Sequence, residues 1–124
     1  NFMLRFLALA VCSGHVEEVY WWRLSARGYG LVDDQNGFAP RPAFSALKFF
    51  LHLLGDAIFV KKHDTAADCY LLEFSRGSER ILMTWQISGE QPLDDYADVK
   101  QGWDAFGGIV EVPVSRPSPT YYSV

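Results

Sequence analysis

The feature that most constrains this chain is a change of periodicity at Gly55. Before it, residues 43–54 carry apolar side chains at helical spacing around all but a narrow polar strip. After it, apolar residues recur at every second position, which is typical of β-strands. The pattern predicts an α+β chain with an α/β unit over residues 1–56 and an antiparallel β domain over residues 57–124.

The helix before Gly55 has clear ends. Pro42 suits a first helical turn, and Gly55 is a natural stop. A long loop with a turn at Asn36-Gly37 precedes this helix. Because so much of its surface is apolar, we expect it to pack on a sheet and on a further element.

Residues 2–12 are apolar at every position except Arg5. A signal peptide is one interpretation, but its apolar core would be only Phe6–Val11, shorter than usual. The interpretation that we favour is a helix that ends near Gly14 and is buried on nearly all sides. Such a helix needs more neighbours than this chain can supply, so we expect the chain to be part of a larger protein.

Residues 16–24 predict a strand, because aromatic and β-branched side chains dominate them. Strand alternation places Trp21 and Arg23 on one face. The other face would carry Tyr20, Trp22 and Leu24. Neither face is polar throughout, so we expect cover on both sides, as in a parallel sheet.

The β domain is predicted from short alternating segments. Residues 58–60 form the first, and residues 70–74 and 81–87 form a hairpin. Two more strands are expected at residues 109–114 and 121–122. These strands predict a small antiparallel sheet or sandwich.

Composition excludes several classes of function. The chain has 124 residues, 49% apolar and 21% charged, with a net charge of −4. This is a globular composition, and its acidity argues against nucleic-acid binding. The sequence contains no run of 18 apolar residues that would predict a membrane span. It also lacks the His and Cys spacing of a metal site, and we expect no cofactor.

Four short motifs follow one another along the chain, and their order and spacing are informative. They are Val19–Leu24, Tyr29–Asp33, Gly37 and Arg41–Leu47. Together they resemble the end of a (β/α)8-barrel glycoside hydrolase of the two-carboxylate clan, especially family 39. In that clan the eighth strand carries an aromatic run with a Trp. A Gly-Leu-hydrophobic-Asp segment follows, then a basic-Pro-Ala stretch that opens the eighth helix, and a small β-sandwich follows in many members.

The resemblance implies that residues 1–56 are the last unit of a TIM barrel, with residues 1–13 as its seventh helix. In the clan, the acid/base Glu follows an Asn, but neither Asn1 nor Asn36 precedes a Glu here. We therefore expect both catalytic carboxylates upstream of Asn1, with none in this chain. The parent protein would be a glycosidase, its partners a carbohydrate substrate and the remainder of the barrel, and this chain alone would be inactive.

Trp21 and Arg23 are the candidate substrate-binding residues. The resemblance implies that a Trp at the end of the eighth strand lines the cleavage subsite, where its flat face meets a sugar ring. The alternative is that Trp21 belongs to the core and that Arg23 pairs with a carboxylate. Trp85 alternates with apolar residues and is predicted to be core.

The carboxylates within the chain make poor catalytic pairs. Glu17 and Glu18 are adjacent, so a strand would point them to opposite faces. The pairs Asp33-Asp34 and Asp94-Asp95 are predicted to form turns. Two alternative functions remain: a carbohydrate-binding β-sandwich module without catalytic activity, and a small secreted β protein.

Overall fold

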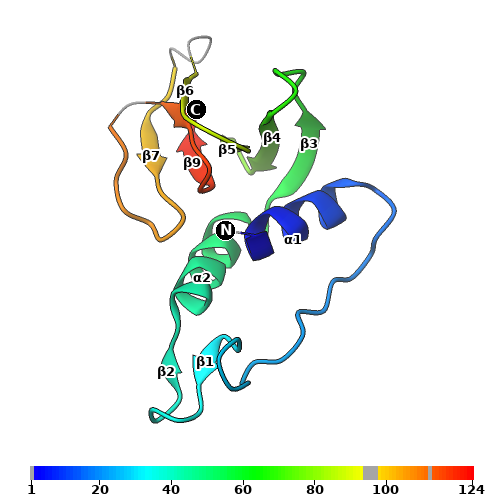
Figure 1. Cartoon of the computed structure of the whole chain (residues 1–124). Helices are drawn as coiled ribbons and strands as arrows, with labels where there is room; N and C mark the ends of the chain where they lie inside the picture. Colours follow the sequence, from blue (N-terminus) through cyan, green and yellow to red (C-terminus); the bar gives the residue numbers. More distant parts are fainter. Residues whose placement is uncertain (1, 94–97, 112) are drawn as a thin grey trace.

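A computed structural model describes residues 2–93, 98–111 and 113–124. The protein has an α+β fold with two helices and mainly antiparallel sheets. Both helices lie beside one face of a five-stranded sheet, and the chain between them runs outward in a wide excursion (Figure 1). No barrel is evident in this part of the chain.

Both predicted helices are confirmed. Helix α1 spans Phe2–Cys12, and α2 spans Pro42–Leu54 with Pro at its first position. The N–H of Gly55 donates to the carbonyl of Leu51 at 2.8 Å and ends α2 at the expected residue. Neither described helix has the length and apolar character needed to cross a bilayer.

The strands form three antiparallel sheets. The five-stranded sheet has the order β3-β4-β5-β9-β7, and β1-β2 and β6-β8 are two-stranded pairs. The predicted hairpin is the β4-β5 pair, which turns at Gly77 with φ of 59°. The bounds are β1 Val32–Asp33, β2 Ala39–Pro40, β3 Ile58–Lys62, β4 Cys69–Arg76, β5 Glu79–Gln86, β6 Gln91–Pro92, β7 Gln101–Trp103, β8 Val114–Ser115 and β9 Thr120–Ser123.

The register gives the large sheet two buried faces. Alternation along β4, β5 and β9 sends one set of side chains toward the helices and the other set away from them. The helix side holds the main core cluster, which includes Leu4, Leu54, Leu72, Met83 and Tyr121. A second cluster on the opposite face joins Leu71, Leu82 and Tyr122, with Leu93, Val99, Val110 and Val124 packed against it.

One core spans the predicted boundary between residues 56 and 57. Phe49 of α2 meets Tyr121 of β9 edge to face, with ring centroids 5.7 Å apart. The helices and the sheet therefore share buried apolar surface, as expected for a helix packed on the sheet that follows it. The division into two domains stays a prediction.

The predicted strand over residues 16–24 is wrong for this structure. The segment is irregular, and β structure begins with an isolated bridge between Ser25 and Val32. The physical reason is the lack of a neighbouring strand, since β propensity alone does not order an unpaired segment. Arg23 also has a φ of 64°, which interrupts an extended backbone.

The predicted strand over residues 109–114 is also wrong for most of its described residues; Val112 lies outside them. Ile109 forms an isolated bridge with Trp103, and regular pairing begins only at Val114 in β8. The hydroxyl of Tyr122 accepts from the N–H of Val114 and donates to its carbonyl, both at 2.9 Å. The Tyr122 side chain thus satisfies backbone groups of Val114, whose partner in the β6-β8 pair is Pro92.

Candidate functional site

The predicted substrate-binding residues lie on the excursion between the helices. Trp21 and Arg23 do not share a strand face, because no strand forms and the backbone turns at Arg23. The guanidinium of Arg23 lies over the ring of Trp22, 5.2 Å from its centroid, in a cation–π contact. The structure thus pairs Arg23 with Trp22 rather than with Trp21.

Trp21 contacts helix α1. Its ring centroid lies 6.4 Å from that of Phe6 in α1, and 39% of the residue is exposed. Trp22 is 71% exposed in this chain. The role of Trp21 and Arg23 in binding a sugar stays a prediction.

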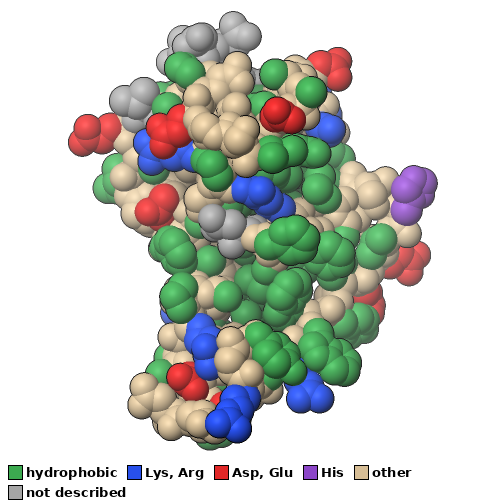
Figure 2. Space-filling view, in the orientation of Figure 1, with side chains coloured by type: hydrophobic (Ala, Val, Ile, Leu, Met, Phe, Trp, Pro, Cys, Tyr) green, Lys and Arg blue, Asp and Glu red, His purple; other side chains and the backbone are tan. Residues whose placement is uncertain are grey.

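Large apolar side chains gather on the surface around this segment. Figure 2 shows hydrophobic side chains spread across the middle of one face, between the sheet and the β1-β2 end of the molecule. The exposed large hydrophobic residues of α1 and of residues 16–24 include Phe2, Phe6, Val11, Tyr20, Trp22 and Leu24. An apolar surface of this kind is typical of a face that another body covers.

Two of the three carboxylate pairs of the sequence lie in the part of the chain that the structure describes. Glu17 and Glu18 are exposed on the irregular segment. Asp33 accepts from the N–H of Gln35 at 3.1 Å and forms an ion pair with Arg41 at 3.4 Å, so its role is to shape the turn. Asp94 and Asp95 lie outside the described residues.

Neither cysteine is a candidate nucleophile. Cys69 is buried in β4, and Cys12 packs at the edge of the main core. Burial raises the pKa of the Cys12 thiol to about 11, which keeps it protonated at neutral pH. Among the described residues, no group of three or more His, Cys, Asp and Glu side chains could hold a metal ion.

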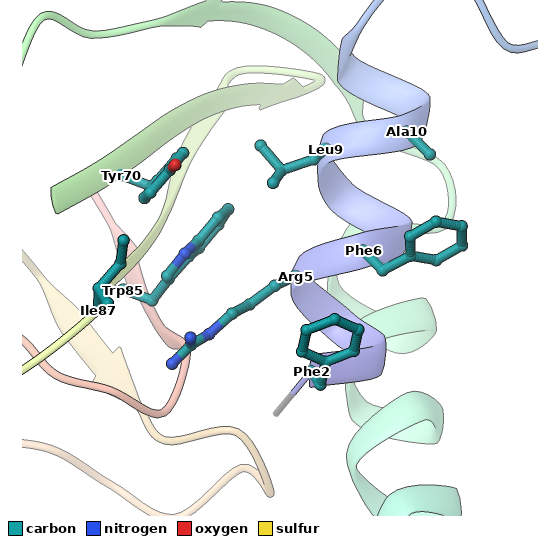
Figure 3. Close-up of a pocket in the computed structure, with 8 residues that line it drawn as sticks. All are labelled: Phe2, Arg5, Phe6, Leu9, Ala10, Tyr70, Trp85 and Ile87. Carbon is teal, nitrogen blue, oxygen red and sulfur yellow. The ribbon is translucent and has the colours of Figure 1, made fainter. Parts of the chain in front are cut away.

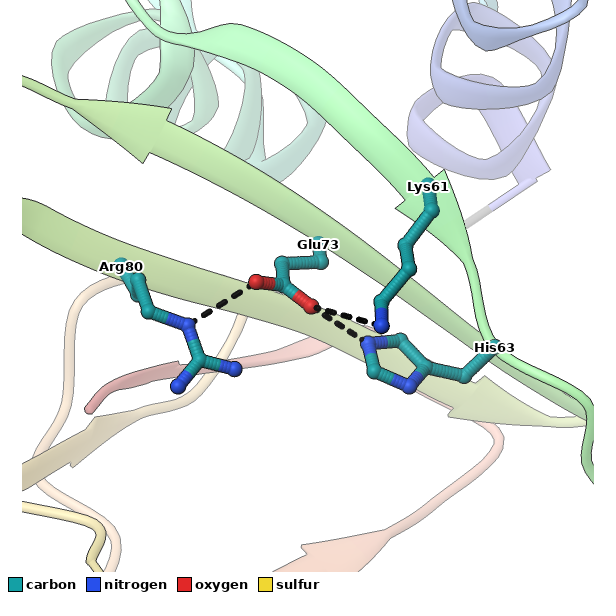
Figure 4. Close-up of polar contacts among 4 residues, drawn as sticks. All are labelled: Lys61, His63, Glu73 and Arg80. Atoms are coloured by element: carbon teal, nitrogen blue, oxygen red, sulfur yellow. Dashed lines mark hydrogen bonds and ion pairs between the residues drawn. The ribbon is translucent and has the colours of Figure 1, made fainter.

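A charged cluster that the sequence did not reveal surrounds Glu73 on the sheet face opposite the helices (Figure 4). Its Oε1 accepts from Arg80 Nε at 2.9 Å, and its Oε2 lies 2.7 Å from His63 Nε2. Lys61 Nζ lies 4.0 Å from the same Oε2. The sequence does place two basic residues, Lys61 and His63, at alternate positions. Their pairing with Glu73, however, depends on the β3-β4 register, which the sequence does not show.

This cluster is a structural clamp rather than a reaction centre. Only 8% of the Glu73 side chain is exposed, and its surroundings favour the charged form. The hydrogen bond from Arg80 is the largest influence and lowers the pKa of Glu73; burial opposes it, and the bond to His63 lowers the pKa further. A carboxylate held ionised by neighbouring cations fastens β3 and β5 to β4.

An apolar groove lies between α1 and the sheet (Figure 3). It has a volume of about 470 Å³. Trp85, 1% exposed, stacks on Tyr70 with the rings 4.9 Å apart and 8° from parallel, which gives the sheet side a rigid wall. The lining residues are Phe2, Arg5, Phe6, Leu9, Ala10, Tyr70, Trp85 and Ile87.

We compared this chain with protein-family models, curated proteins and solved structures. No protein-family model, no curated protein and no solved structure matches this chain.

Proposed function

We propose that this chain is the C-terminal part of a (β/α)8-barrel glycoside hydrolase that acts on a poly- or oligosaccharide. In this proposal, residues 1–56 are the last barrel unit and residues 57–124 an accessory β domain. Trp21 and Arg23 line the substrate site, and the catalytic carboxylates come from the preceding part of the barrel. The resemblance of the sequence motifs suggests the proposal, and three features of the structure support it.

The observation that carries the proposal is that residues 16–24 are unpaired and that many of their apolar side chains are exposed. This segment is rich in strand-forming residues, yet no strand of the described chain pairs with it. Its side chains Tyr20, Trp22 and Leu24 are exposed. Apolar and β-branched side chains of this kind are typical of a strand covered on both faces, and a parallel barrel strand would provide that cover.

The arrangement of the helices supports the same proposal. Met3, Leu4 and Ala8 of α1 are buried, while Phe2, Phe6 and Val11 remain exposed. α1 therefore has one apolar side against this chain and another side without cover. A helix of a barrel has such surroundings, because it packs both on the strands and on neighbouring helices.

The large sheet favours the glycosidase proposal over a separate carbohydrate-binding module. A binding module of that kind needs aromatic side chains exposed on one sheet face. Here the aromatic residues at the centre of the sheet are almost completely buried, with Trp85 at 1% and Tyr121 and Tyr122 at 0%. The sheet thus uses its central aromatic residues for packing. The exposed aromatic residues include Tyr20, Trp22, Tyr29 and Phe38 on the excursion and Phe2 and Phe6 on α1.

The test begins with the transcript upstream of the codon for Asn1 and with the mass of the native polypeptide. We expect an in-frame barrel with an Asn-Glu pair, and hydrolysis of aryl glycosides by the native protein. Trp21→Ala should then lower kcat/KM by about 10- to 100-fold, as expected for a lost stacking contact. Trp22→Ala is the matched control, and it should change stability more than activity once the barrel covers residues 16–24.

Three results would contradict the proposal: an upstream sequence without barrel periodicity, a native protein inactive on every glycoside tried, or full activity in Trp21→Ala. If Trp22→Ala is stable but inactive and Trp21→Ala is unstable but active, Trp22 lines the site instead.

A further inference from the structure

We propose that the groove between α1 and the sheet binds a small molecule with one carboxylate on an apolar body. Arg5 would pair with the carboxylate, and the aromatic walls would hold the apolar part. The groove shares Phe2 and Phe6 with the α1 surface that the proposed barrel would cover, so the inference applies to the chain as the structure describes it. Its test measures binding and not hydrolysis, and its failure is therefore distinguishable from failure of the glycosidase proposal.

The charge in the groove selects an anion. Arg5 extends from α1 across the groove toward the sheet, on the side of Trp85 and Ile87 (Figure 3). Its Nε atom is buried and has no hydrogen-bond partner among the described residues. In that same part of the chain, no Asp or Glu forms an ion pair with Arg5. A buried guanidinium nitrogen without a partner is costly, and a bidentate carboxylate matches its geometry.

The walls select an apolar body. All seven lining residues other than Arg5 have aliphatic or aromatic side chains, and the groove volume of about 470 Å³ lies in the range of small-molecule sites. Trp85 and Tyr70 cannot shift easily, because they stack face to face and belong to adjacent strands. The sheet wall of the groove is thus already formed before a ligand binds, which reduces the entropy cost of binding.

Charge complementarity distinguishes this occupant from others. A neutral apolar molecule would leave the Arg5 nitrogen without a partner, and a cationic one would face like charge. An anion without an apolar body, such as acetate, would leave Leu9 and Ile87 exposed, as they are now. A carboxylate with an apolar chain satisfies both features of the groove.

The test uses the full chain at low micromolar concentration and three probes with the same apolar chain: decanoate, decanol and decylammonium. Each is added below its micelle-forming concentration. Tryptophan fluorescence measures affinity, and backbone amide NMR shifts locate the site. We expect decanoate to bind about tenfold more tightly than the other two, with shifts at Tyr70 and Ile87 rather than at Trp22.

Variants separate the contribution of charge from that of shape. Arg5→Gln should remove the preference for decanoate, and Arg5→Glu should transfer it to decylammonium. Ala10→Trp should fill the groove and weaken all three probes. Arg27→Gln is the matched control, because this exposed arginine lies on the excursion and does not line the groove.

The circular dichroism spectrum of each variant establishes that the fold is retained. Equal affinity of the wild type for decanoate and decylammonium would overturn the proposal. So would a decanoate preference that survives in both Arg5 variants, or shifts centred on Trp22.

Discussion

Replacing Glu73 with Gln should destabilise the protein by removing a charge and keeping the shape. The carboxylate accepts from Arg80 at 2.9 Å and contacts His63 at 2.7 Å. A hydrogen bond that involves a charged group contributes about 1.5–3 kcal/mol. The Arg80 side chain is 50% exposed, so water screens its share. We expect Glu73→Gln to lower the free energy of unfolding by about 2 kcal/mol, which corresponds to about 8 °C in Tm.

Urea denaturation at pH 7 measures this loss, and the chain supplies a matched control. Glu79 pairs with Arg76 at 2.9 Å, but its side chain is 40% exposed. Glu79→Gln makes the same chemical change at a surface pair, so we expect a loss below about 0.5 kcal/mol. The difference between the two variants reports the contribution of burial.

The stabilisation by Glu73 should depend on pH in a defined direction. The pKa of Glu73 is lowered in the folded state, mainly by the hydrogen bond from Arg80. Its stabilising contribution is therefore complete above the pKa of the unfolded chain and is lost as pH falls through the lower pKa of the folded state. The gap between wild type and Glu73→Gln should shrink in acid, beginning below about pH 4.5. Equal losses in the Gln variants at pH 7, or a gap that stays constant to pH 2.5, would refute this reasoning.

Four further outcomes are expected. Trp85→Ala should cost about 3–5 kcal/mol of stability in the isolated chain, whereas Trp22→Ala should change it by less than about 0.5 kcal/mol; urea denaturation compares them. Gly102→Ala should cost about 1–3 kcal/mol, because a Cβ there would lie 2.7 Å from the Tyr122 ring, and thermal melting measures the loss. The 124-residue chain should not hydrolyse aryl glycosides, and turnover abolished by a carboxylate variant of this chain would contradict that. Sedimentation should show self-association as concentration rises, since Phe2 and Trp22 are exposed.

Much of the fold follows from local sequence signals. Pro42 and Gly55 set the ends of α2, and the alternation around Gly77 sets the β4-β5 hairpin. These features depend on residues close together in the chain, so periodicity and turn chemistry predict them. The α+β class followed from the same two periods.

The sequence could not predict features that depend on distant partners. Residues 16–24 have strand composition, but a strand forms only when another strand lies beside it. The Glu73 cluster joins β3, β4 and β5, and its register includes an irregularity between Phe59 and Lys61. The groove at Arg5 likewise combines α1 with strands more than 60 residues away, so neither site has a signature in any short window.

The position of β9 has a consequence for biosynthesis. Residues 120–123 lie between β5 and β7, and Tyr121 and Tyr122 enter the two opposite cores. A ribosome that has made α1, α2 and the β4-β5 hairpin has therefore produced a sheet without its fourth strand, with both apolar faces incomplete. The nascent chain must hold that exposed surface until residue 123 emerges, which makes this stretch a natural client for chaperones. A stop codon directly after Pro119 would remove β9 and leave both cores without their tyrosine.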